Sequence, residues 1–539
     1  MFVIWTSLEL NKYFNIHHAA SISQNSIMKG KSKVYEVNKP YLSSITLDNG
    51  KTLQDDLSGT TSSPHRNEHG IHWAMAAVFI VGDMMGAGMI SLPLALGNAG
   101  LGPGIAIILL ASLFSGYTGI QLGDNWTMLQ NRWTEYKQHC RRPYPEMAYR
   151  ALGPWAKQAV SILLALSQFL IASVLLLMCA ENLTTLLNVF FGWHLDFCVF
   201  IVALAAALWP LVMLQSPMDF WQLAIISAVS SSLAAGFIIA GSIHDSSACV
   251  PSRKLPSLSF TNFSLAYGTI VFAYGGHGAF PTIQHDMKKP QYFNRSVFWS
   301  YIFITIVYVA VSTTGLLVYG NSMVDTVIPS IQLKWISQTI NVMITLHIFP
   351  TIVIVFSPLS QQVEEWFRAP NEFGVKRFLI RTLLLGCSTF LSLSVLKLGV
   401  FLDLVGATTI TLMTMLLPSV FYLFLQASWK KRQDAIQSGL LSSNSPDDQI
   451  AKFSDIVYYT PKMILLFNVL SLTFGFVGGV SSAYSAIKEL IGAHQVAPCY
   501  VRWFQEGFLG HSNGGSTHCC GEFSNVSYYH DISVCSVRP

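Results

Sequence analysis

The stretch Ile80-Val-Gly82-Asp83-Met-Met-Gly86-Ala-Gly88-Met-Ile-Ser91-Leu-Pro93 decides how this chain folds. It lies inside an apolar segment long enough to cross a bilayer, yet it holds three glycines, a proline and an aspartate. Glycine and proline weaken a helix, and a carboxylate in lipid is costly unless it faces a cavity or a partner. We therefore predict a membrane-spanning helix that is interrupted near its middle.

A second stretch, Phe272-Ala-Tyr274-Gly275-Gly276-His277-Gly278-Ala-Phe280-Pro281, repeats this composition about 190 residues later. Five apolar segments begin at each stretch. Matched interruptions in two halves of a chain favour a transporter built as an inverted repeat. The alternative is that Gly86 and Gly88 only form a small-residue face for close helix packing.

The interruptions also predict a ligand. An unwound segment frees N–H and C=O groups that cannot stay unpaired in hydrocarbon. The positive N-terminal end of a half-helix suits a carboxylate, and the freed carbonyls suit an ammonium group or a cation. An α-amino acid carries both groups, so the two interruptions together form a zwitterion site.

The composition agrees with a lipid-embedded chain. Of 539 residues, 52% are hydrophobic and only 11% charged, whereas soluble domains carry about 25% charged residues. A net charge of +4 does not favour a nucleic-acid partner. We find no zinc-ligand spacing, no phosphate-binding loop and no catalytic nucleophile, so we expect neither an enzyme nor a cofactor.

The hydropathy pattern predicts an all-α membrane protein in three parts: a disordered cytosolic tail over 1–70, a transporter domain over 71–486 and an extracytoplasmic cysteine-containing tail over 487–539. Eleven membrane-spanning helices are expected in the middle part. They cover about 71–97, 103–122, 157–181, 196–215, 219–242, 262–284, 296–319, 335–357, 378–396, 399–425 and 462–486.

The placement of basic residues predicts the orientation. With the N-terminus in the cytosol, 25 of the 32 lysines and arginines fall on the cytosolic side. The odd number of helices then puts the C-terminus outside the cell or in a lumen. Asn182, Asn262 and Asn525 head glycosylation sequons on that outer side. Cys198 and Cys249 are a candidate disulfide there, the alternative being two unpaired thiols.

At these motifs the chain resembles the amino acid/auxin permease family, which includes proton-coupled, vesicular and vacuolar amino acid transporters. The resemblance rests on Gly86 to Pro93, on Phe272 to Pro290, and on Tyr144-Pro145-Glu146 in the first cytosolic loop, and it covers about 70–486. It implies a five-plus-five inverted repeat of the LeuT type with helices 1 and 6 broken, plus an eleventh helix. Many members carry Asn where Gly82 stands, which leaves the coupling ion open between a proton and sodium.

The residue match implies that the backbone around Gly86 and Gly88 holds the substrate carboxylate, and that Tyr274 to His277 line the site. The expected substrate-binding residues are Gly82, Asp83, Met85, Gly86, Ala87, Gly88, Phe272, Tyr274, Gly275 and Gly276.

Three side chains are candidates for ion coupling. Asp83 is expected to accept a proton or to pair with the substrate ammonium, the alternative being a structural hydrogen bond. The ordinary pKa of a histidine, about 6.5, would suit His277 to proton coupling. The alternative is a buried neutral histidine that packs against the first helix. Thr345 would serve only a sodium-coupled protein. His347 and Asp403 are interpreted as structural.

The sequence therefore predicts secondary active transport of small neutral amino acids by alternating access, driven by a proton or sodium gradient. The protein resides in the plasma membrane or in a lysosomal or vesicular membrane, with the bilayer and the amino acid as its partners. The competing hypothesis is a transport-like sensor that binds an amino acid at the same interruptions and signals through its N-terminal tail.

Overall fold

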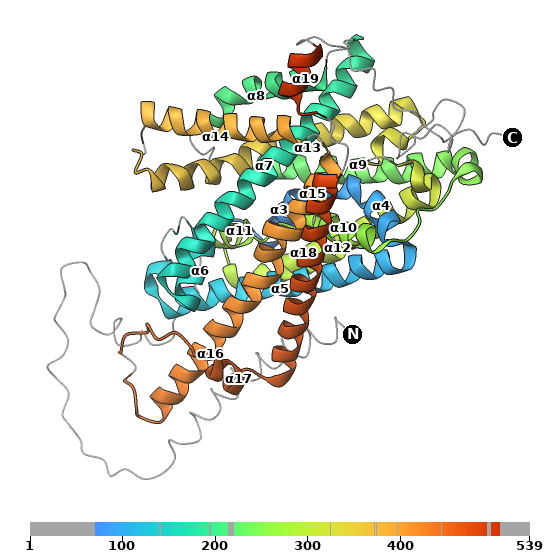
Figure 1. The fold of residues 1–539 in the computed structure, drawn as a ribbon. Helices are drawn as coiled ribbons and strands as arrows, with labels where there is room; N and C mark the ends of the chain where they lie inside the picture. The colour runs from blue at the N-terminus through green and yellow to red at the C-terminus, as the bar shows by residue number, and fades with distance from the viewer. Residues whose placement is uncertain are drawn as a thin grey trace, which may run out of the picture. The chain divides into compact units, whose positions relative to one another are not determined.

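The computed structural model describes residues 70–506 apart from 138–139, 141, 193–195, 214–219, 324, 371, 373, 396, 443–444 and 493–496. The expected N-terminal tail, except for Gly70, and Asn525 lie outside the described residues. The helices in Figure 1 are α3 (Trp73–Met84), α4 (Ala87–Ala99), α5 (Leu101–Arg132), α6 (Pro143–Leu152), α7 (Pro154–Phe191), α8 (Phe197–Met213), α9 (Phe220–Cys249), α10 (Phe260–Ala273), α11 (Phe280–His285), α12 (Phe293–Tyr319), α13 (Lys334–Trp366), α14 (Val375–Ser394), α15 (Leu398–Val405), α16 (Leu417–Gln437), α17 (Phe453–Tyr459), α18 (Lys462–Gly492) and α19 (Cys499–Glu506).

The all-α membrane fold is confirmed. Within the described ranges, eight helices are long and apolar enough to cross a membrane, and the α3–α4 pair forms a further crossing. The shorter apolar helices α8 and α10 complete the eleven segments expected from the sequence. Their order gives a first series of five that begins with α3–α4, a second series that begins with α10–α11, and α18 as the eleventh.

Both predicted interruptions are present. The axis bends by 58° between α3 and α4, and Gly86 takes a non-helical backbone conformation (φ −153°, ψ −118°). In the second series α10 ends at Ala273 and α11 begins only at Phe280. Clustered glycines explain both breaks, because they gain least from helix formation and tolerate unusual backbone angles.

The helices pack in two groups. In one, α12 lies against α3, α4 and α5, and α10 lies against α4 and α18. In the other, α13 and α14 both pack against α7, and α14 also packs against α8. Helix α9 contacts both groups, through α3 and α12 on one side and α13 on the other. The interrupted helices therefore belong to one group and face the second group, which α7, α8, α13 and α14 form.

The tenth segment is continuous but irregular. Between α15 and α16 it contains two π-helical turns, Gly406–Ile410 and Leu412–Leu416. Such turns redirect side chains and occur often at functional sites.

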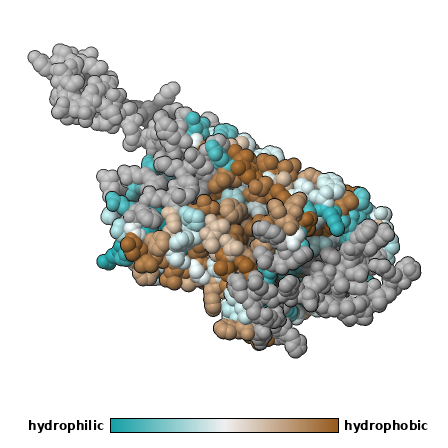
Figure 2. Space-filling view, turned by 90° about the horizontal axis from the view of Figure 1, so that it is seen from above, coloured by the Kyte–Doolittle hydropathy of each residue, from teal (hydrophilic) through white to brown (hydrophobic). Residues whose placement is uncertain are grey.

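Large apolar side chains remain exposed on the outer faces of the helices. Ile306, Leu383 and Phe476 are each more than 60% exposed. Figure 2 shows apolar side chains spread over much of the face in view. Exposure on this scale requires an apolar solvent, and a lipid bilayer provides it.

The disulfide expectation was wrong in its partner. Cys198 at the start of α8 bonds to Cys499, with a Cα–Cα distance of 5.6 Å, and not to Cys249. The reason is α19, a short helix that lies against α14 and close to α8 in Figure 1. Tyr500 stacks on Phe390 of α14 at 5.5 Å between ring centroids. These contacts bring the first residue of α19 to Cys198.

One predicted glycosylation site does not suit a glycan. Asn182 lies within α7 with only 7% of its surface exposed, so its amide is out of reach. Asn262 lies in the first turn of α10, where its backbone N–H bonds to the Ser259 hydroxyl. It stays a prediction.

A buried ion pair ties the far end of α5 to the segment that follows α16. Nε and Nη2 of Arg132 donate to the two carboxylate oxygens of Asp447, at 2.9 and 2.8 Å. The Arg132 side chain is only 1% exposed, and its Nη1 donates to Ser428 of α16. A nearby exposed pair joins Arg150 of α6 to Asp448 at 3.1 Å.

Candidate functional site

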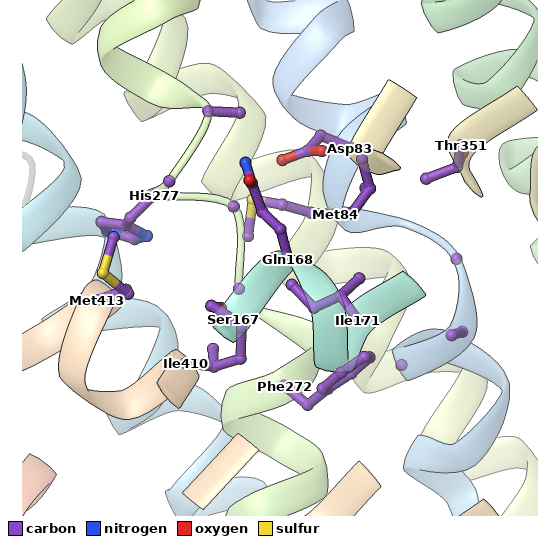
Figure 3. A pocket seen from close by; sticks show the side chains of 18 of the residues that line it. Asp83, Met84, Ser167, Gln168, Ile171, Phe272, His277, Thr351, Ile410 and Met413 are labelled. Carbon is purple, nitrogen blue, oxygen red and sulfur yellow. The ribbon is translucent and has the colours of Figure 1, made fainter. Parts of the chain in front are cut away.

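A cavity of about 110 Å³ opens between the two groups of helices, at the level of both interruptions. Figure 3 shows it from close by. Its wall consists of Asp83, Met84, Gly86, Ala87 and Gly88 from the first interruption, Leu164, Ser167, Gln168, Ile171 and Leu175 from α7, Phe272 and Gly275 to Ala279 from the second interruption, His347, Thr351 and Val355 from α13, and Ile410, Met413 and Thr414 from the π-helical segment.

The first turn of α4 borders this cavity. The N–H groups at the start of a helix have no acceptor in the preceding turn, and Ala87 and Gly88 occupy these positions. Gly88 packs directly on α10, since a Cβ on residue 88 would lie 2.5 Å from the Cα of Ala273. The glycine thus lets the two interrupted helices meet, and the helix end beside it suits an anion.

Asp83 lies on the other side of the same break. No described side chain pairs with its carboxylate. A Cβ on residue 276 would lie 2.9 Å from Asp83 Oδ2, so the carboxylate rests against the backbone of the second interruption. A carboxylate held between two unwound segments in a largely buried cavity is suited to bind a cation or a proton.

His277 has a fixed tautomer. Its Nε2 lies 2.9 Å from the Ser115 carbonyl oxygen, which can only accept, so Nε2 carries the hydrogen. Its Nδ1 is buried and has no hydrogen-bond partner among the described residues. The ring stacks on Phe280 at 4.7 Å between centroids. His277 therefore turns one nitrogen to α5 and keeps the other as a free acceptor.

His347 borders the cavity, and its interpretation as structural stays a prediction. Its Nδ1 lies 3.0 Å from the Ser231 hydroxyl of α9, which orients the ring. Its Nε2 faces the first interruption, because a Cβ on Gly86 would lie 2.1 Å from it. Two histidines, one from the second interruption and one from α13, thus border one cavity.

The wall contains both polar and apolar side chains. In Figure 3 the amide of Gln168 rises toward the Asp83 carboxylate, while Ile171, Ile410 and Phe272 lie on the opposite side. No lysine or arginine appears among the described residues of the wall. The cavity therefore combines one carboxylate, a few hydrogen-bonding groups and an apolar face, as ligand sites usually do.

The structure places the predicted residues unequally. Asp83, Gly86, Ala87, Gly88, Phe272, Gly275, Gly276 and His277 all border the cavity. Three others stand outside its wall: Gly82, Met85 and Tyr274. Gly82 instead packs against α9, where a Cβ would lie 2.6 Å from the Ala224 carbonyl oxygen. Thr345 is also outside, and its hydroxyl donates to Asn341 in its own helix at 2.7 Å.

The contributions of α7 and the π-helical segment escaped the sequence reasoning. Ser167 and Gln168 form a polar pair in the middle of a 38-residue apolar helix, and this was the available signal. No sequence signal pointed to Met413 and Thr414. Both lie in a π-helical turn that borders the cavity, and the sequence pattern does not reveal this turn.

Comparisons with known proteins identify the family of this chain. The sequence profile described as "Transmembrane amino acid transporter protein" matches residues 69–444. The chain is 24% identical to the amino acid transporter AVT1I of Arabidopsis thaliana, over 65% of this chain and 85% of that one. It is 24% identical to AVT1E of the same plant, over 85% of this chain and 80% of that one.

Two solved structures are also similar. One is MhsT in complex with L-phenylalanine, with 14% identity over 78% of this chain and all of that chain, at a TM-score of 0.49. The other is the inward-facing conformation of Mhp1, with 9% identity, a TM-score of 0.47, and coverage of 81% of this chain and 99% of that one. From the profile match over most of its length, this chain belongs to the family of transmembrane amino acid transporter proteins.

Proposed function

We propose that this protein is a secondary active transporter of small neutral amino acids, which it binds at the two interruptions and moves by alternating access. The observation that carries the proposal is that one cavity receives both interruptions. The free N–H groups at the start of α4 suit the substrate carboxylate, and Asp83 suits its ammonium group.

The charge of the wall supports a neutral side chain on the substrate. Once the ammonium group occupies Asp83, no second described carboxylate of the wall remains for a basic side chain. An acidic side chain would find no lysine or arginine. Ile171, Phe272 and Ile410 offer an apolar surface instead, and a volume of about 110 Å³ has room for a small side chain.

Asp83 and the two histidines support coupling to an ion gradient. In this proposal Asp83 exchanges a proton, or pairs with a sodium ion or the substrate ammonium, during each cycle. His277 borders the same cavity, and its buried Nδ1 has no hydrogen-bond partner among the described residues. Which ion drives transport is decided by experiment.

The proposed orientation has the N-terminus in the cytosol and the C-terminus outside the cell or in a lumen. The asymmetry of 25 against 7 basic residues supports it. The Cys198–Cys499 disulfide supports it too, since disulfides persist in oxidising compartments and this bond lies on the predicted outer side.

The test is uptake of a panel of radiolabelled amino acids into proteoliposomes under imposed proton or sodium gradients. We expect small neutral amino acids to accumulate above equilibrium with one gradient, and the accumulation to collapse when an ionophore dissipates it. Asp83→Asn should abolish accumulation or its pH dependence, while the exposed Asp448→Asn should not.

The competing hypothesis is an amino acid sensor. Saturable binding to the purified protein, without accumulation under either gradient, would favour the sensor and contradict transport. A variant Asp83→Asn that accumulates substrate with unchanged pH dependence would remove the proton role of Asp83 alone.

A further inference from the structure

Side chains of helix α12 form hydrogen bonds with the main chain of α3. Three hydroxyl groups on one face of α12 lie within hydrogen-bond distance of three backbone carbonyls of α3, so sliding of α3 along α12 would disrupt these contacts. The bonds run from Ser296 to Trp73 (2.7 Å), from Ser300 to Ala77 (3.0 Å) and from Tyr308 to Met84 (2.8 Å). The Ser300 hydroxyl shares its hydrogen with the Ser296 carbonyl of its own helix at 2.7 Å.

The last of these hydroxyls also reaches the second interruption. The Tyr308 hydroxyl lies 2.9 Å from the carbonyl oxygen of Ala273. Met84 and Ala273 are the last residues of α3 and α10, so neither carbonyl keeps a helical partner four residues on. The Met84 carbonyl also accepts from the Gly86 N–H at 3.1 Å. Tyr308 is fully buried, and one side chain thus joins the ends of both interrupted helices.

A proton count shows what this arrangement allows. A phenolic hydroxyl has one hydrogen and can donate it to only one carbonyl at a time. The two carbonyls therefore share one donor, which can pass between them. Tyr308 therefore stays bonded to one of the two helix ends whichever carbonyl accepts its hydrogen, and this keeps the two ends together.

The Tyr308 ring strengthens the same link. Tyr274, the first residue after α10, packs edge-on against Tyr308 at 5.2 Å between centroids and stacks on Tyr301 at 5.9 Å. Aromatic pairs at these distances attract one another. Helix α12 therefore holds the second interruption as well as the first.

We propose that Tyr308 is a positioning residue that couples the two interrupted helices, so that α3 and α10 change position together during transport. It does not border the cavity, whereas Met84 does, so it acts through the backbone and not on the substrate. The inference rests on the proposed function, because a substrate held by both interruptions needs both to move as one.

The variant Tyr308→Phe tests this, since it keeps the ring and removes only the hydroxyl. Tyr301→Phe is the matched control, with the same change on the same helix. In the described part of the chain, the Tyr301 hydroxyl bonds to neither helix end. Size-exclusion profiles of both purified variants should match the unmodified protein.

We expect Tyr308→Phe to lower the maximal uptake rate about tenfold, with KM within about threefold of the unmodified protein. Tenfold corresponds to about 1.4 kcal/mol, the scale of one hydrogen bond. Tyr301→Phe should stay within about threefold in both constants. Equal behaviour of the two variants, or a change confined to KM, would overturn the proposal.

Hydrogen–deuterium exchange tests the same point without transport. Tyr308→Phe should speed exchange in peptides covering 81–88 and 272–279 together, and Tyr301→Phe in neither. Faster exchange at one interruption alone would contradict the coupling. Failure of the unmodified protein to accumulate any amino acid would instead contradict the proposed function, and the exchange data would still decide the role of Tyr308.

Discussion

The imidazole of His347 occupies the space where a side chain at residue 86 would stand, because a Cβ on Gly86 would lie 2.1 Å from His347 Nε2. The ring cannot easily withdraw, since the Ser231 hydroxyl holds its Nδ1 at 3.0 Å. Glycine is therefore needed at position 86 for two reasons: the close contact with His347 and the non-helical backbone angles. The first interruption and α13 fit together only without a side chain at this position.

The variant Gly86→Ala should lower amino acid uptake at least tenfold. The added methyl group must displace the His347 ring or reshape the break, and either change disturbs the first turn of α4, which borders the cavity. The measurement is initial-rate uptake into proteoliposomes, normalised to the amount of inserted protein.

Gly236→Ala is the control for this change. It makes the same substitution inside a membrane helix, α9, but a Cβ there meets nothing within 4 Å. Uptake by Gly236→Ala should equal that of the unmodified protein. If Gly86→Ala also transported normally, the close contact with His347 would have no functional weight.

Breaking the disulfide should release α19. Cys499→Ser is expected to lower thermal stability in detergent, since a disulfide commonly contributes about 2–4 kcal/mol. Cys198→Ser should have the same effect, and the double variant should lose no more than either single variant because both remove one bond.

Peptide mapping under non-reducing conditions identifies the partner directly. The linked peptides should contain Cys198 and Cys499. A linked peptide that contains Cys249 would restore the pairing first expected from the sequence.

The Cys140 thiol should react slowly at neutral pH. It lies in the connection between α5 and α6, where burial raises its pKa above the usual range and a hydrogen bond from the backbone of Arg142 opposes the rise only in part. The thiolate is the reactive form, so a raised pKa lowers reactivity at pH 7. Alkylation by iodoacetamide should keep accelerating above about pH 9.

A matched probe is Leu440→Cys in a Cys140→Ser background, since residue 440 is 83% exposed. Its alkylation rate should level off near the ordinary thiol pKa of about 8.5. Mass spectrometry of the two peptides gives both profiles. If the two pH profiles coincided, Cys140 would be as accessible to water as residue 440, which would contradict the burial seen in the structure.

The sequence predicted the membrane spans and their interruptions better than the contacts between distant segments. Spans and both interruptions follow from local composition, because twenty apolar residues must cross lipid and clustered glycines must weaken a helix. The partner of Cys198 did not follow, because it depends on how α19 folds back onto α14.

The cavity shows the same division. The residues at the interruptions were predicted because their glycines stand out in the sequence. The positions of His347 and Gln168 at the cavity were not predicted, because the direction of a histidine or glutamine in a long apolar helix is unknown until the helix is placed. The π-helical turns turn Met413 toward the cavity, and no local pattern signals them.

The Arg132–Asp447 ion pair should contribute far more to the free energy of unfolding than the Arg150–Asp448 pair does. Arg132 is 1% exposed and Asp447 14%, so Asp447→Asn leaves a buried guanidinium without its counter-charge. Removing one partner of a buried pair typically costs about 3–5 kcal/mol. Asp448 is 73% exposed in its pair with Arg150, and Asp448→Asn should cost less than about 1 kcal/mol.

Thermal unfolding of the two variants in the same detergent measures this difference, with a marked fall in Tm expected for Asp447→Asn alone. The double variant Arg132→Gln with Asp447→Asn should recover part of the loss, because it removes the buried guanidinium that Asp447→Asn leaves without a counter-charge. Arg432, whose Nη1 lies 3.8 Å from Asp447, keeps its hydrogen bonds to the Ser445 and Pro446 carbonyls. Equal Tm values for Asp447→Asn and Asp448→Asn would show that water screens both pairs alike. The segment after α16 would then not be fastened to α5 through this contact, since only a buried ion pair makes the loss of one partner costly.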